Sequence, residues 1–197
     1  MNFLEEKILA DGCIRQGNIL KVDNFINHQI DISIMRKIAQ EFKHRFKDEE
    51  VTKILTIEAS GIAIAVLLAD LYGVPALFAK KGGSANCTDD KYTSHAFSFT
   101  HKKTESVFVS KPYLLANDKV LIVDDFLAEG QAMNALIDIV HQAGAIVVGC
   151  GVAIEKGFQK GGRELREQGY HVESIAIVDE MDYEKGTITF RNKKVKR

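Results

Sequence analysis

The stretch VLIVDDFLAEGQA, residues 120–132, decides how the rest of the chain is interpreted. Four apolar residues run into Asp124 and Asp125, a short loop with Gly130 follows, and a helical pattern begins at Gln131. The apolar run predicts a buried strand, and a glycine loop that opens a helix presents free backbone N–H groups at the positive end of the helix dipole. Such a loop binds phosphate, and two adjacent carboxylates can accept hydrogen bonds from a vicinal diol. The stretch therefore predicts a site for one sugar phosphate.

Within this stretch, the phosphate cradle is expected at Ala128, Glu129 and Gly130, with Gln131 and Ala132 as the first helical residues. Other interpretations of the two acids stay open. Adjacent acids after a buried strand also occur in receiver domains, where they bind magnesium and accept a phosphoryl group, and acids can simply be solvated. A Walker A loop is excluded, because the chain contains neither GxxxxGKS nor GxxxxGKT.

Outward from this stretch, short apolar runs alternate with helical patterns. Over 51–154 this alternation predicts a mostly parallel sheet with helices on both faces, whose ligands bind outside the carboxyl ends of the strands. Strands are expected at 53–57, 74–80, 120–124, 145–154, 172–178 and 187–190, and helices at 3–11, 34–46, 62–72, 131–143 and 162–169. The segments 95–100 and 105–110 are expected to form the two arms of a hairpin. A long loop is expected at 81–96, an irregular polar segment at 20–31 and a solvated basic tail at 193–197.

Composition narrows the class of protein. The 197 residues, 46% of them hydrophobic, predict a single domain over 1–197 with a sizeable core. The formal net charge of −1 gives no field that would favour nucleic acid or a membrane surface, so neither is expected as a partner. Three widely spaced cysteines, no basic-then-apolar leader and no apolar run of about 20 residues predict a cytoplasmic protein.

Three further motifs, LKVDNFINHQID at 20–31, TIEASGIAIA at 56–65 and AIEKGFQ at 153–159, extend the pattern over nearly the whole chain. Together with 120–132 they resemble the type I phosphoribosyltransferases, and among these the branch of bacterial enzymes that use xanthine. The resemblance implies an α/β fold of that type, a mostly parallel central sheet flanked by helices, with a small hood formed by N- and C-terminal segments. It also implies transfer of the phosphoribosyl group from phosphoribosyl diphosphate to xanthine.

The loops after two other strands fit a diphosphate. Ala59, Ser60 and Gly61 are small enough for backbone N–H groups to approach it, and the resemblance implies a cis peptide bond, expected at Ala59–Ser60. Lys81 is expected to bind the polyanion. Lys80 departs from the Arg-Lys pair common in relatives and lacks the planar fork of arginine, which puts its role in doubt.

The base is expected near Lys156, whose ammonium follows a buried strand and can donate to a purine 6-oxygen. Phe158 could stack on the base, although a core position is nearly as reasonable for an aromatic side chain. Leu20 and Asn27 become base-binding candidates only through the resemblance, since by themselves they read as a core residue and a turn former.

The resemblance also bears on the metal and the partners. Mg²⁺ is expected to be bound with the diphosphate, and direct ligation of the metal by side chains is not predicted. A homodimer is expected, because the N-terminal helix and the loop after 74–80 carry apolar residues and lysines with no evident intrachain role. The segment 82–96 is expected to close over the site. The alternative function is a non-catalytic regulator of the same fold that senses phosphoribosyl diphosphate, which normally carries an added DNA-binding domain.

Overall fold

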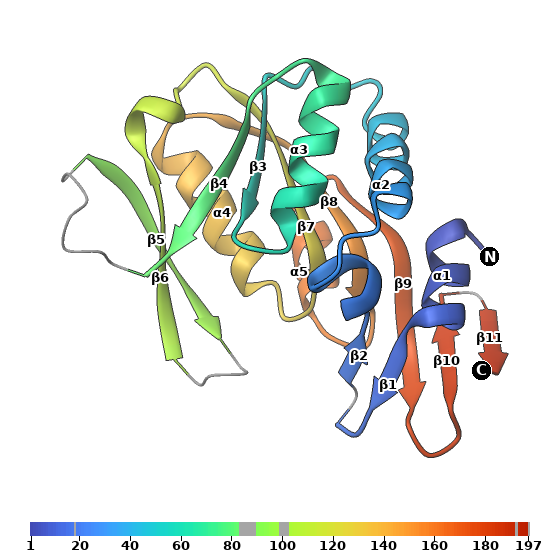
Figure 1. Ribbon diagram of the computed structural model, residues 1–197. Coiled ribbons are helices and arrows are strands. Elements are labelled where there is room, and N and C mark those ends of the chain that lie inside the picture. The colour runs from blue at the N-terminus through green and yellow to red at the C-terminus, as the bar shows by residue number, and fades with distance from the viewer. Residues whose placement is uncertain (18, 83–89, 99–102, 192, 197) are drawn as a thin grey trace.

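The structure is a computed structural model, and it describes residues 1–197 except 18, 83–89, 99–102, 192 and 197. It contains helices on both faces of one large sheet, together with a small separate hairpin (Figure 1). The elements are α1 (Phe3–Asp11), β1 (Cys13–Arg15), β2 (Ile19–Lys21), the π-helix η1 (Asp23–Asn27), α2 (Ile32–Arg45), β3 (Lys53–Ile57), α3 (Gly61–Tyr72), β4 (Ala76–Lys81), β5 (Lys91–Ser98), β6 (Lys103–Ser110), the 3₁₀ turn η2 (Lys111–Tyr113), β7 (Lys119–Leu127), α4 (Gln131–Gln142), β8 (Ile146–Lys156), α5 (Gly161–Glu167), β9 (Val172–Asp182), β10 (Thr187–Phe190) and β11 (Lys193–Lys196).

The large sheet has the strand order β11-β10-β9-β8-β7-β3-β4-β6-β5. Its middle is parallel, because β3 pairs with β4 and β7, and β8 pairs with β7 and β9, all in the same direction. The flanking pairs are antiparallel, including the β5–β6 hairpin and the β9–β10 pair. The prediction of a mostly parallel sheet is confirmed, and β7, which carries the paired acids, lies in the parallel core.

Two apolar clusters cover the two faces of the sheet. One contains the buried sides of α2 and α3 and packs Phe42 and Phe46 against the sheet, where Gly149 and Gly151 of β8 leave room for the two rings. The other contains the buried side of α4 and Leu165 of α5. Such burial on both faces explains why β3 and β7 are nearly continuous apolar runs.

The N- and C-terminal segments meet beyond β9, as the hood predicted from the resemblance requires (Figure 1). Asn2 caps α1 and also donates from Nδ2 to the Ile175 carbonyl of β9, 2.6 Å away. Leu4 and Ile8 of α1 are fully buried in the same cluster as Phe190 of β10. The prediction that the N-terminal helix lacks an intrachain role was therefore wrong for its apolar residues.

Two strands extend further than the apolar pattern predicted. The parallel ladder between β7 and β8 continues to the pair Leu127–Glu155, so Asp124 and Asp125 lie inside β7 and not beyond its end. Lys156 pairs with Val178 of β9 and is the last residue of β8. Apolar content marks where a strand is buried, whereas backbone pairing can continue into polar residues, which is why the sequence placed both ends too early.

Three other expectations need correction. The segment 20–31 is not irregular throughout, since it contains the end of β2 and the π-helix η1. The long loop predicted over 81–96 ends earlier, because β5 begins at Lys91 and pairs along β6. Residues 193–196 of the basic tail form β11 on the edge of the sheet, where no strand was expected. The predicted closure of 82–96 falls mainly on 83–89, outside the described residues.

Among the described residues, no helix combines the length and the apolar composition needed to cross a membrane.

Candidate active site

Asp124 and Asp125 are the centre of the site. Although both are charged types, each is only 6% exposed, because β7 carries them at the buried end of the parallel ladder. The Asp125 backbone N–H donates to Asp124 Oδ1 at 2.9 Å. Asn27, the last residue of η1, donates from Nδ2 to Asp125 Oδ2. The hood thus contacts the paired acids directly through a residue that the sequence placed among the base-binding candidates.

The two acids interact electrostatically. Burial, followed by the negative charge of Asp125, raises the pKa of the Asp124 carboxyl well above its usual range. The positive charge of Lys81 acts in the opposite direction and favours the ionised form of Asp124. A cationic sugar or a diol that donates hydrogen bonds would relieve the same repulsion.

The start of α3 approaches Asp124 closely. A side chain at Gly61 would bring its Cβ within 2.0 Å of Thr56 Oγ1 and 3.1 Å of Asp124 Oδ1, so only glycine fits here. Ala59 is exposed and Ser60 is half-buried in the turn between β3 and α3. The cis peptide bond of this turn joins Glu58 to Ala59, so the predicted position at Ala59–Ser60 was wrong by one residue.

The two neighbouring lysines at the end of β4 point to different places. The Lys81 backbone N–H donates to Glu58 Oε1 at 2.6 Å, which ties the end of β4 to the turn after β3, and its charge reaches Asp124. Lys80 instead lines a groove of about 190 Å³ with Phe78 and Tyr113. Successive residues of a strand face opposite sides of the sheet, and the structure accordingly brings Lys81, and not Lys80, to the acids.

The predicted cradle forms a short turn between β7 and α4. Gly130 has φ of 83°, a left-handed conformation that favours glycine, and α4 begins directly after it at Gln131 as predicted. Ala128 and Glu129 are half-buried. Gly161, the first residue of α5, packs against this turn: its N–H donates to the Ala128 carbonyl at 3.1 Å, and a Cβ on it would lie 2.5 Å from the Gly130 nitrogen.

Of the base-binding candidates, Lys156 and Phe158 lie at and just after the end of β8, whereas Leu20 lies in the separate β1–β2 hairpin. Lys156 is half-buried, and its Nζ lies 6.0 Å from the centre of the ring of Phe126, the residue after Asp125. Burial lowers the pKa of the Lys156 ammonium. Leu20 is 6% exposed and belongs to the main apolar cluster. Phe158 is exposed in the turn after β8 and is not a core residue.

Sequence reasoning missed three contributors: Glu58, Phe126 and Gly161. The GG pair at 161–162 was a visible signal, since adjacent glycines at the start of a helix indicate close backbone approach. The sequence around Glu58 and Phe126 did not indicate a place in the site, because their contacts depend on which strands are neighbours in the sheet. The site therefore combines a buried acid pair, a glycine turn that opens a helix and a lysine at the end of a neighbouring strand.

Comparison with known proteins agrees with this geometry. Residues 22–186 match the model of the phosphoribosyl transferase domain family. A xanthine phosphoribosyltransferase of Lachnoclostridium phytofermentans is 53% identical over 194 residues, which cover 98% of this chain and 100% of that relative. A second xanthine phosphoribosyltransferase, of Bifidobacterium adolescentis, is 51% identical over 193 residues with the same coverage.

Solved structures resemble the fold as well. An adenine phosphoribosyltransferase of Thermoanaerobacter pseudethanolicus superposes with a TM-score of 0.73 at 23% identity, covering 88% of this chain and 98% of that one. A Giardia lamblia adenine phosphoribosyltransferase in complex with 9-deazaadenine gives a TM-score of 0.73 at 17% identity, covering 92% of this chain and 100% of that one. At these identities the likeness concerns the fold alone, and it is the fold that was expected.

Asp124→Asn is predicted to stabilise the folded protein at neutral pH. A carboxyl whose pKa is raised by folding is most favourable when protonated, so its contribution is lost as the pH rises through the folded-state pKa. Asparagine avoids this loss and can keep the bond from the Asp125 N–H. Urea unfolding should show a gain near pH 8, which shrinks towards about pH 4, where free aspartate itself becomes protonated.

Asp48→Asn serves as the control, because Asp48 is exposed and its replacement should leave stability unchanged at both pH values. A variant at position 124 that is less stable than the wild type near pH 8, or one whose gain is independent of pH, would contradict the electrostatic account.

Proposed function

The chain belongs to the phosphoribosyltransferase family, and we propose that it transfers the phosphoribosyl group from phosphoribosyl diphosphate to xanthine, releasing xanthosine monophosphate and diphosphate. This is a purine salvage reaction. The observation that carries the proposal is the buried Asp124–Asp125 pair, placed directly before a glycine turn that opens a helix and contacted by Asn27. Two relatives that align over nearly their whole length are named as transferases of xanthine, and neither is named as a regulator.

In this proposal the acid pair binds the ribose. The carboxylates of Asp124 and Asp125 accept hydrogen bonds from the ring diol, and Ala128, Glu129, Gly130 and the first residues of α4, Gln131 and Ala132, hold the 5′-phosphate through backbone N–H groups. As the bond from the anomeric carbon to diphosphate breaks, positive charge develops on the ribose. The two carboxylates place negative potential beside it and so favour the transition state over the neutral sugar.

The diphosphate is proposed to lie over the turn after β3. Ala59, Ser60 and Gly61 offer small side chains there, and Lys81 supplies positive charge from the end of β4. Mg²⁺ bound with the diphosphate would neutralise the leaving group. Mg²⁺ commonly keeps several waters and takes substrate phosphate oxygens as ligands, so the ion is proposed to be carried by the diphosphate, without direct ligation by Asp124 or Asp125.

The base is proposed to lie between η1 and the end of β8. Lys156 donates to the 6-oxygen, which favours 6-oxopurines over adenine, and Phe158 can move its exposed ring onto the base. Asn27 Nδ2 carries two hydrogens, so one can remain on Asp125 while the other donates to the xanthine 2-oxygen. Leu20 of β2 is proposed as an apolar wall of the base subsite, since it belongs to the same apolar cluster as Phe25 and Ile26 of η1 and is 6% exposed.

We further propose that two copies associate through the face of β4 and η2. Phe78 and Tyr113 are 40% and 64% exposed, and they line one groove together with Lys80 and Phe108. Isolated exposed apolar residues need no explanation, but this set is contiguous and partly concave, as interfaces are. The single domain over 1–197 and the cytoplasmic location stay predictions.

Activity on three bases tests the reaction. The wild type should use xanthine with a higher kcat/KM than guanine or hypoxanthine when phosphoribosyl diphosphate is supplied. Lys156→Ala should lower kcat/KM for all three, because all share the 6-oxygen. Asn27→Ala should instead reduce the preference for xanthine, by about 1–3 kcal/mol if one buried hydrogen bond is lost.

Two results would overturn parts of this proposal. A wild type that prefers hypoxanthine would show that the substrate is wrong. An equal loss on all three bases in Asn27→Ala would show that Asn27 acts through Asp125 alone and does not distinguish the 2-position.

Sedimentation velocity tests the association. The wild type should sediment as a dimer at assay concentration, and Tyr113→Glu should shift it towards the monomer by placing a charge in the exposed groove. Tyr183→Glu is the matched control, since Tyr183 is also exposed but lies in the turn between β9 and β10. A monomeric wild type with full activity would contradict the proposal.

A further inference from the structure

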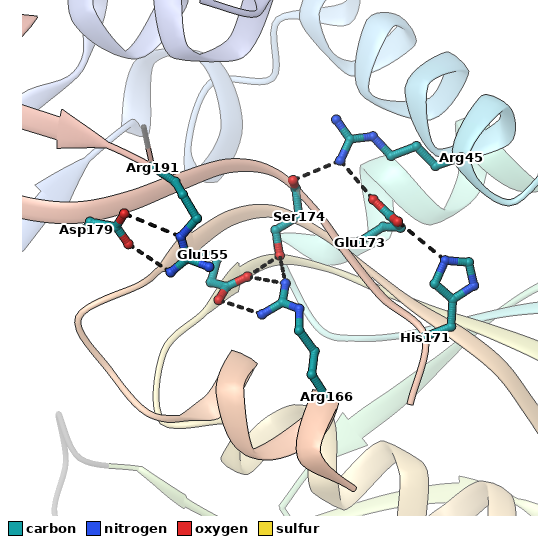
Figure 2. A network of polar contacts seen from close by, with 8 residues as sticks. All are labelled: Arg45, Glu155, Arg166, His171, Glu173, Ser174, Asp179 and Arg191. Atoms are coloured by element: carbon teal, nitrogen blue, oxygen red, sulfur yellow. Dashed lines mark hydrogen bonds and ion pairs between the residues drawn. The ribbon is translucent and has the colours of Figure 1, made fainter. Parts of the chain in front are cut away.

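Glu155, the residue before Lys156, is a buried carboxylate for which the reaction itself supplies no role. Its side chain is 3% exposed. Both of its oxygens accept from Arg166 of α5, at 2.9 Å from Nη1 and 2.7 Å from Nη2, in the planar two-bond geometry that arginine forms with carboxylates (Figure 2). Ser174 of β9 donates its hydroxyl to the same carboxylate.

This carboxylate stays ionised. Burial acts to raise the pKa of Glu155, but the hydrogen bonds from Arg166 and Ser174 and the charges of Arg166 and Arg191 outweigh it and lower the pKa below its usual range. Arg191 is itself held by Asp179, with Nη2 2.9 Å from Oδ1 (Figure 2). Glu155 is thus fixed by side chains of α5 and β9.

The network also extends to α2. Arg45 donates from Nη1 to the Ser174 carbonyl at 2.9 Å and to Glu173 Oε2 at 3.0 Å (Figure 2). Ser174 is therefore held through its backbone on one side and through its hydroxyl on the other. Glu155, which accepts from the Ser174 hydroxyl, also accepts from Arg166 of α5 and so links β9 to α5.

The chain between Glu155 and Arg166 touches both subsites of the proposed reaction. It begins beside Lys156, the proposed reader of the base. It then returns through Gly161, whose N–H donates to the Ala128 carbonyl of the phosphate cradle. The helix start is packed tightly at this point, because a Cβ on Gly162 would lie 2.1 Å from Glu155 Oε1. The ion pair thus closes a ring that holds the base reader at one point and the phosphate cradle at another.

We propose that Arg166 is a positioning residue, and that its two-bond ion pair with Glu155 sets the separation between the base subsite at Lys156 and the phosphate subsite at 128–130. The inference rests on the proposed function. Arg166 does not contact substrate in this account. A buried ion pair contributes little net stability compared with an apolar pair of the same size, whereas the planar fork fixes relative orientation. The ion pair is therefore proposed to act on the geometry of the site and not mainly on the stability of the fold.

Arg166→Lys tests this, because lysine retains the charge that compensates Glu155 but cannot form the two parallel bonds. Arg163→Lys is the matched control: it is the same change on the same helix, at a side chain that is 71% exposed and pairs only loosely with Glu167 at 3.9 Å. The readout is binding, by calorimetry, of xanthosine monophosphate, which bridges the two subsites, and of phosphoribosyl diphosphate, which occupies the phosphate side without the base. Thermal unfolding is measured in parallel.

In Arg166→Lys the affinity for the bridging nucleotide should fall about tenfold or more, the scale expected when groups are displaced by a fraction of an ångström to 1 Å. The affinity for phosphoribosyl diphosphate should change less than about twofold, and Arg163→Lys should behave as the wild type. Equal losses for both ligands, as general loosening would give, overturn the inference, and so does an unchanged affinity for the nucleotide. If the wild type binds phosphoribosyl diphosphate but no purine nucleotide, the proposed function fails first and the positioning role with it.

Discussion

The structure depends on one electrostatic constraint: two carboxylates must lie side by side inside a buried parallel strand, close to its carboxyl end. Burial and mutual repulsion both oppose ionisation of Asp124, so the arrangement is unfavourable without compensating groups. The surroundings supply them. Asn27 donates to Asp125, the Asp125 N–H donates to Asp124, and the charge of Lys81 acts on Asp124 from the next strand but one. A diol that donates two hydrogen bonds would add to these compensating groups. The unfavourable electrostatics of the acid pair are thereby linked to its proposed role in binding the ribose.

Parallel topology explains how distant parts of the chain reach these acids. Because β3, β4, β7 and β8 run in the same direction, their carboxyl ends, and the turns that follow them, gather at one edge. Close approach at that edge needs residues without side chains. Gly61 leaves space for Thr56 and Asp124, and Gly161 leaves space for the cradle turn. Charged anchors such as Glu155 and Arg166 then fix the distances between turns that the backbone alone would leave adjustable.

Much of this arrangement could be predicted from the sequence. The apolar run at 120–123, the acids and the glycine turn were sufficient to predict a parallel strand and a phosphate-type helix start, because local residue types determine both. The hood residues Leu20 and Asn27 could be identified only by resemblance, since their places depend on packing between the N-terminal segment and the sheet. The exact strand ends and the position of the cis bond were predicted wrongly, because ladder pairing and turn geometry are set by neighbours distant in sequence. The ion pair of Glu155 with Arg166 had no signal at all, as both residues read as ordinary surface charges.

The most direct test of the account is equilibrium binding of phosphoribosyl diphosphate to the wild type and to a variant in which Asp124 and Asp125 are both asparagine. If the acid pair binds the ribose diol, the double variant should remain folded, with a melting temperature no lower than that of the wild type, and its affinity should fall by about tenfold or more, since two charged acceptors are lost. A folded double variant that binds phosphoribosyl diphosphate as tightly as the wild type would contradict the central claim that these two carboxylates hold the sugar.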